Sequence, residues 1–148
     1  MFSGEYPCKL DDKGRFILPT PLREQFESES PEESKTAMLI KGQEKCLWMY
    51  TTEHWKTVLQ RTKERLDEDQ SRLFMHFVVS ESMESELDRA GRMLIPKRLR
   101  DFANLDREVV LLGMYERIEI WSTEGWNEYL SRVEEKFETT LSKFLNIL

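Results

Sequence analysis

The sequence predicts a mainly β fold with flanking helices, built from two related halves and ending in an amphipathic helix. Three observations carry this prediction. The segment Leu10–Arg23 aligns with Leu87–Arg100 and is identical at half of its positions. A further pair of matching apolar segments follows each copy, and the last stretch of the chain places apolar residues at helical spacing. A repeat of this length indicates a domain duplication rather than a solenoid.

The repeat defines the organisation of the chain. Both copies read Leu-Asp-x-x-Gly-Arg followed by three apolar residues and Pro. Further on, Cys46–Tyr50 aligns with Arg117–Trp121, with six more residues in the first copy. The polar run Glu27–Lys35 is the place where we expect that insertion, as a surface loop. Halves this small are expected to share one core.

Each half is predicted to begin with a β-hairpin and a short helix. In the first half, Glu5–Leu10 and Phe16–Leu18 are predicted strands joined by the polar turn Asp11–Arg15. Glycine in each turn suits a positive φ, and Pro19 and Pro96 suit a helix start. Leu22 and Phe26, four residues apart, give the first of these helices one apolar face.

A second hairpin and helices follow. Met38–Ile40 and Leu47–Tyr50 are predicted to pair around Gly42. A longer helix is expected to begin near Thr51 or Thr52, and Ser71 is expected to cap another. The second half repeats the same order. The predicted units are residues 1–55 (first half), 56–79 (helical connector), 80–126 (second half) and 127–148 (C-terminal helix).

The C-terminal helix has an apolar stripe whose steps of three and four residues approach a heptad seam. Its members are Trp126, Leu130, Val133, Phe137, Leu141, Phe144 and Leu148. The stripe could pack on its own domain or form a seam between subunits. A helix lying on a membrane surface favours Lys and Arg on its polar face, whereas this helix carries more Glu, so no membrane partner is expected.

Charge is unevenly distributed. The formal net charge is −6, but Lys9–Arg23 carries +2 and Asp88–Asp101 carries +3, which leaves −11 for the rest of the chain. An acidic protein with two basic patches repels polyanions everywhere except at those patches. No run of about 20 apolar residues and no secretory leader is evident, so Cys8 and Cys46 are expected to be reduced thiols of a cytoplasmic protein.

The repeated turns are the candidate binding site. Arginine is suited to bidentate contact with phosphate or guanine, and the Asp of each turn could accept turn amides or orient the Arg. An ion-paired turn with no ligand is the alternative, but the repetition favours binding. The candidate DNA-binding residues are Lys13, Arg15, Arg23, Arg89, Arg92, Lys97, Arg98 and Arg100. The candidate structural residues of the turns are Asp11, Gly14, Asp88 and Gly91.

An enzyme is not expected. His54 and His76 lie outside the repeat, and no phosphate-binding loop or nucleophile motif is present. The spacing of Cys and His matches no common zinc site. We therefore expect no catalytic residue, metal, cofactor or small-molecule substrate.

The motifs resemble those of the MraZ family of bacterial transcription regulators, within the AbrB-type (SpoVT-AbrB) DNA-binding superfamily. The resemblance extends from Met1 to about Val133. It rests on Met1-Phe2-x-Gly4-Glu5-Tyr6, on both Leu-Asp-x-x-Gly-Arg turns, and on Ile118-Glu119-Ile120-Trp121. It implies a double-split, swapped-hairpin-like β-barrel formed within one chain, with both Asp-x-x-x-Arg turns in a DNA-binding surface.

The same resemblance implies a homo-oligomeric ring that binds short G-rich direct repeats in double-stranded DNA. These repeats would lie upstream of the cell-division and cell-wall gene cluster, which includes the protein's own gene, and the protein would be cytoplasmic and nucleoid-associated. The two turns differ, since Lys13 aligns with Ala90 and Asp12 with Arg89. They need not contact DNA alike. An antitoxin-like or scaffold module that binds a protein partner is the alternative function.

Overall fold

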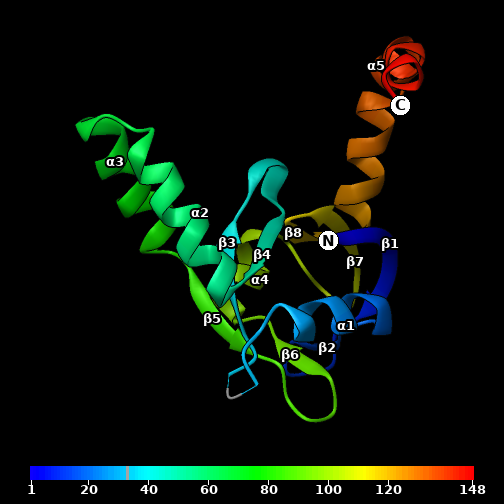
Figure 1. The fold of residues 1–148 in the computed structure, drawn as a ribbon. Coiled ribbons are helices and arrows are strands. Elements are labelled where there is room, and N and C mark those ends of the chain that lie inside the picture. The colour runs from blue at the N-terminus through cyan, green and yellow to red at the C-terminus, as the bar shows by residue number, and fades with distance from the viewer. Residues whose placement is uncertain (33) are drawn as a thin grey trace.

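The structure is a computed structural model that describes residues 1–32 and 34–148. Within these residues, the chain forms eight strands, with helical segments between and after them (Figure 1). The strands are β1 (Phe2–Lys9), β2 (Arg15–Ile17), β3 (Thr36–Lys41), β4 (Leu47–Thr51), β5 (Met83–Glu86), β6 (Arg92–Leu94), β7 (Glu108–Tyr115) and β8 (Arg117–Ser122). The helices are α1 (Thr20–Ser28), η1 (Gln43–Lys45), α2 (Thr52–Glu64), α3 (Glu68–Phe74), η2 (Met75–Val79), α4 (Lys97–Phe102) and α5 (Thr123–Ile147).

Six of the described strands form one antiparallel sheet in the order β1-β7-β8-β4-β3-β5, and β2 pairs with β6 in a separate two-stranded ribbon. The two halves are therefore interleaved. The β7–β8 hairpin of the second half is flanked by β1 of the first, and the β3–β4 hairpin of the first half is flanked by β5 of the second. The mainly β prediction is confirmed. Within the described residues β1 and β5 remain the edges of the sheet, which is not closed into a barrel.

The predicted hairpin between the first two strands of each half is wrong. The turn does close, since the amide of Asp11 donates to the carbonyl of Arg15 at 2.8 Å. Beyond it, however, β1 pairs along its whole length with β7, whereas β2 pairs with β6 of the other half. The second half behaves in the same way, because β5 pairs with β3. A turn motif specifies a local reversal, but the tertiary packing selects the strand partner.

The second predicted hairpin, β3–β4 around Gly42, is confirmed. Its strands and those of the β7–β8 hairpin are apolar on both faces because the sheet lies between two layers. One face of the sheet is turned toward the ribbon and helices α1 and α4. On this face residues such as Leu39 and Leu111 are buried in one core cluster with Phe16, Phe26 and Leu99. This layer holds the largest core cluster.

The opposite face of the sheet carries α2 and α5. Ile40 and Tyr50 pack with Trp55 and Val58 of α2. Val110 and Trp121 lie in a cluster against which the start of α5 packs. In Figure 1 the ribbon lies at the lower end of the molecule, whereas α2–α3 and α5 extend from the upper end as two separate arms. The ribbon and the two arms are therefore at opposite ends of the molecule.

Several predicted element boundaries shift by a few residues. Helix α2 begins at Thr52, as expected, and Thr51 caps it by accepting the amide of His54 at 3.1 Å. The cap of α3 is Asp67 and not Ser71, because Asp67 and Gln70 form a reciprocal capping box. The predicted loop Glu27–Lys35 begins later than expected, since α1 continues to Ser28. Position 33 in that segment lies outside the described residues.

The unit boundaries predicted at 55/56 and 126/127 fall inside α2 and α5. Within the described chain, no helix combines the length and apolar character needed to span a bilayer.

Candidate nucleic-acid interface

The first Asp-x-x-x-Arg turn is closed by the side chain of its aspartate. Asp11 Oδ1 accepts the backbone amides of Lys13 and Arg15, each at 2.9 Å. Asp11 Oδ2 accepts Nε of Arg15 at 2.9 Å. The amide of Gly14 donates to the carbonyl of Asp11 at 3.0 Å, and Gly14 has φ +85°. The sequence left these two roles of the aspartate as alternatives, and its side chain fills both.

The second turn repeats this arrangement. Asp88 Oδ1 accepts the amides of Ala90 at 2.9 Å and Arg92 at 2.8 Å, and its Oδ2 accepts Nε of Arg92 at 2.9 Å. Gly91 has φ +82°. The exchange of Lys13 for Ala90 leaves this geometry unchanged, because the residue at that position contributes its backbone amide.

Hydrogen bonding stabilises the ionised form of both aspartates. The amide of Arg15 lowers the pKa of Asp11, and together with the Lys13 amide and the Arg15 guanidinium it outweighs the opposing effect of desolvation. The amide of Arg92, together with its guanidinium and the amide of Ala90, does the same for the pKa of Asp88. Each arginine is held at Nε, and among the described residues its two Nη groups form no hydrogen bond.

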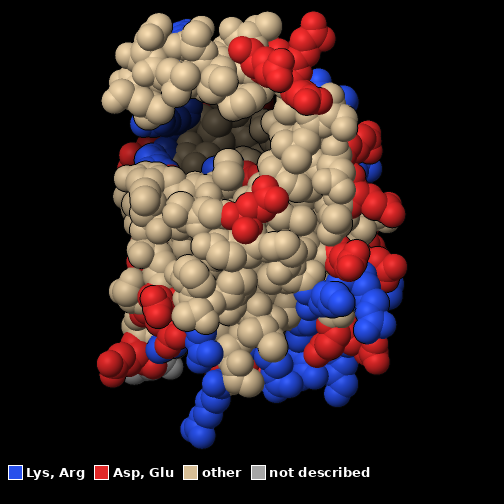
Figure 2. All heavy atoms as spheres, turned by 90° about the vertical axis from the view of Figure 1, so that its right-hand side faces the viewer, with Lys and Arg blue, Asp and Glu red and all other residues tan. Residues whose placement is uncertain are grey.

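The ribbon register places both arginines on one face. Arg15 lies opposite Leu94, and Ile17 lies opposite Arg92. Side chains alternate along a strand, so these four share one face, while Phe16 and Met93 point into the core. Figure 2 shows Lys and Arg gathered at the lower end of the molecule, where β2 and β6 lie in Figure 1, with Asp and Glu at its sides.

Each turn is hydrogen-bonded to the other half of the chain. Leu18 donates its amide to the carbonyl of Gly91 at 2.8 Å, and Ile95 donates to the carbonyl of Gly14 at 2.9 Å. The guanidinium of Arg100 lies directly over Gly14, and that of Arg23 lies over Gly91. The two halves therefore form a single ribbon whose ends are the two turns.

The model of the family described as "MraZ protein, putative antitoxin-like" matches residues 1–77 and again residues 78–146. The chain belongs to the MraZ family. The "Transcriptional regulator MraZ" of Moorella thermoacetica is 37% identical to this chain over 150 residues, which cover 99% of this chain and 98% of that protein.

The remaining candidate residues of this MraZ-family chain differ in their surroundings. Lys13 and Arg89 are exposed at the turn tips and form no ion pair with any described residue. Lys97 pairs with Asp101 at 2.9 Å, and Arg98 pairs with Glu81 at 2.8 Å. Both lie on α4 beside the ribbon, and both are more than half exposed.

Arg23 and Arg100 are bound within the protein. Arg23 Nε donates to Glu27 at 2.8 Å, and Arg100 Nε donates to the carbonyl of Ile95 at 2.9 Å. Both side chains brace the turn of the other half. Two residues of the same surface were not identified from the sequence, Ile17 and Leu94, which are 64% and 43% exposed. Strict alternation after each Arg could have predicted their outward direction.

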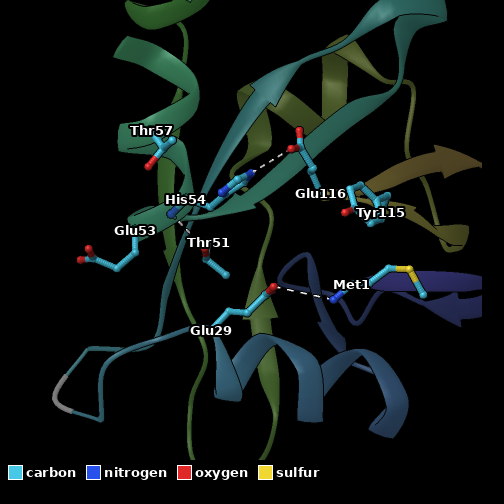
Figure 3. A pocket seen from close by; sticks show the side chains of 8 residues that line it. All are labelled: Met1, Glu29, Thr51, Glu53, His54, Thr57, Tyr115 and Glu116. Atoms are coloured by element: carbon cyan, nitrogen blue, oxygen red, sulfur yellow. Dashed lines mark hydrogen bonds and ion pairs between the residues drawn. The ribbon is translucent and has the colours of Figure 1, made fainter. Parts of the chain in front are cut away.

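A pocket lies away from the ribbon, between the start of α2, the β7–β8 turn and the N-terminus (Figure 3). Its charged groups contact one another. Glu116 lies 3.8 Å from Nε2 of His54 and 3.2 Å from Arg61, and Glu29 lies 3.8 Å from the terminal ammonium. Among residues 1–32 and 34–148, no three His, Cys, Asp or Glu side chains are grouped so as to hold a metal ion.

Proposed function

We propose that this chain is a transcription regulator that binds double-stranded DNA sequence-specifically, with the outer face of the β2–β6 ribbon and its two turns. One observation carries the proposal. Arg15 and Arg92 share that face, and each is held at Nε by an aspartate of its own turn. Membership of the MraZ family and the name of the Moorella thermoacetica relative, a transcriptional regulator, support it.

The geometry suits DNA because the arginines are oriented before binding. A guanidinium fixed at Nε presents two Nη donors, which match two phosphate oxygens or the O6 and N7 atoms of guanine. A two-stranded ribbon fits the major groove. Lys13, Arg89, Lys97 and Arg98 would add phosphate contacts around the ribbon. The acidic remainder of the protein would keep DNA from binding elsewhere.

Assembly into a homo-oligomeric ring is part of the proposal. One subunit offers few phosphate contacts, so several linked subunits would gain affinity through effective concentration. Large apolar side chains are exposed on both arms, as an interface between subunits would require. Those on α3 and η2 are Leu73, Met75 and Phe77, and those on α5 include Phe137, Leu141, Phe144 and Leu145. The direct repeats of the DNA would match the repeated subunits.

We also propose the DNA sequence, the cellular location and the barrel architecture that the family resemblance implies. The DNA would be short G-rich direct repeats upstream of the division and cell-wall gene cluster, including the protein's own gene, with the protein on the nucleoid. The interleaved halves would correspond to a double-split barrel. We propose no catalytic step and no cofactor. An antitoxin-like function is the alternative, favoured by the exposed apolar face of α5.

The test is a fluorescence-anisotropy titration of labelled DNA from upstream of the protein's own gene, at two salt concentrations. We expect tight, salt-sensitive binding, because phosphate contacts release counterions. The Arg15→Ala/Arg92→Ala variant should lose it. The matched control Arg61→Ala/Arg65→Ala removes the same charge from the α2 arm and should bind almost as the wild type does. Undiminished binding by the ribbon variant would refute the site, and no binding by any form would favour a protein partner.

A further inference from the structure

The outer face of the ribbon carries two aliphatic side chains. Phosphate binding by the arginines does not explain why they are there. Ile17 is 64% exposed and Leu94 is 43% exposed. The outer face of an antiparallel pair that meets water is normally polar. Here it alternates, because Arg15 lies opposite Leu94 and Ile17 lies opposite Arg92. Residues directly opposite one another on an antiparallel pair have Cβ atoms about 5 Å apart, so the four form one contiguous patch.

Both halves place an aliphatic residue at the same point, two positions after the arginine of the turn. The halves differ freely nearby, since Lys13 aligns with Ala90 and Asp12 with Arg89. The core does not require these aliphatics, because Phe16 and Met93 supply the buried side chains of the ribbon, at 2% and 1% exposure. An exposed aliphatic retained in both halves is therefore explained better by a contact outside the chain.

The chemistry of the surroundings selects the occupant. Each aliphatic has a clamped arginine beside it, and the aspartates that hold those arginines are occupied by turn amides. The patch thus combines guanidinium donors with apolar surface, and its carboxylates already accept hydrogen bonds from the turns. The major groove offers the complement, with guanine acceptors for arginine and thymine methyl groups for apolar side chains.

We propose that Ile17 and Leu94 contact thymine methyl groups in the major groove and thereby contribute to sequence specificity, while Arg15 and Arg92 supply the polar contacts. The inference rests on the proposed DNA binding. It assigns the two aliphatics to base recognition and not to phosphate binding. Their loss should therefore weaken binding to the specific site more than binding to unrelated DNA, and it should leave the salt dependence unchanged.

The experiment combines protein variants with modified DNA. Anisotropy titrations would use the Ile17→Ala/Leu94→Ala variant and DNA in which thymines of the site are replaced one at a time by deoxyuridine, which lacks only the methyl group. We expect the variant to bind the specific site about tenfold more weakly, with unrelated DNA affected less than twofold, as for other lost base contacts. At one or more positions, deoxyuridine should weaken wild-type binding severalfold but leave binding by the variant unchanged.

Controls separate the possible failures. Met114→Ala removes an equally exposed (43%) apolar side chain from β7 and should have no effect. The deoxyuridine titration of the wild type needs no variant to fold. If the wild type binds the DNA but the aliphatic variant and deoxyuridine change nothing, or if specific and unrelated DNA weaken equally, this inference is overturned and the proposed function stands. If the wild type does not bind DNA, the proposed function itself fails.

Discussion

Leu18 donates its backbone amide to the carbonyl oxygen of Gly91 at 2.8 Å, which ties the ribbon strand of the first half to the turn of the second. The converse bond, from Ile95 to Gly14, has a length of 2.9 Å. The proposed binding surface is therefore formed by both halves together. A substitution in one turn is therefore expected to alter the conformation of the ribbon strand in the other half.

Gly14→Ala and Gly91→Ala should each destabilise the protein. Both glycines have positive φ, which costs an alanine about 1–2 kcal/mol. A Cβ on Gly14 would also come within 2.5 Å of Nε of Arg100. Urea denaturation should show this loss, whereas Ala90→Ser, an exposed change in the same turn, should show almost none. Equal stability of the glycine variants would contradict the assigned turn conformation.

Arg100→Ala should loosen the turn of the first half, although Arg100 belongs to the second. The side chain lies over Gly14 and donates to the carbonyl of Ile95 at 2.9 Å, a bond worth about 1 kcal/mol. Hydrogen exchange should speed up at the amides of Gly14 and Ile95 and stay unchanged at Gly91. Arg98→Ala, a more exposed change on the same helix, is the control. Faster exchange at both turns alike would argue against cross-bracing.

Acid should open both turns. Hydrogen bonds from turn amides lower the folded-state pKa of Asp11 and Asp88. Their contribution to stability is therefore fully present above the unfolded-state pKa of about 3.9, and it is lost as the pH falls through the lower folded-state value. Carboxyl-carbon NMR titration should give midpoints below about 3.9 for both residues. Asp11→Asn should remove part of the acid sensitivity, and midpoints at or above the free value would contradict the hydrogen bonding described.

Truncation after Ser131 should reduce the size of the proposed oligomer. It removes the exposed apolar part of α5 and keeps the aromatic cluster in which Trp121 lies 5.1 Å from both Trp126 and Tyr129, measured between ring centroids. Sedimentation or light scattering would measure the mass. The full-length Phe137→Ser/Phe144→Ser variant tests the same face without shortening the chain. An unchanged mass in both would place the subunit interface elsewhere.

Much of the site could be predicted from the sequence because its chemistry is local. The Asp, Gly and Arg of each turn lie within five consecutive residues, so spacing alone predicted the positive φ of Gly14 and the capture of the turn amides by Asp11. The amphipathic pair Leu22 and Phe26 likewise placed α1 on the core. Such features depend on the backbone geometry of a few consecutive residues, and the identities of those residues specify that geometry directly.

The sequence by itself determined the two halves, their turns, the β3–β4 hairpin and the mainly β class. Only the tertiary structure decided that β1 pairs with β7 and β2 with β6, and that Arg23 and Arg100 brace the opposite turns. The physical reason is that the backbone groups that join two strands are the same for nearly all residues, so these hydrogen bonds do not specify which strands pair. A strand pairs with whichever partner buries the most apolar surface, and here each half, too small to form a core alone, does so by exchanging strands with the other.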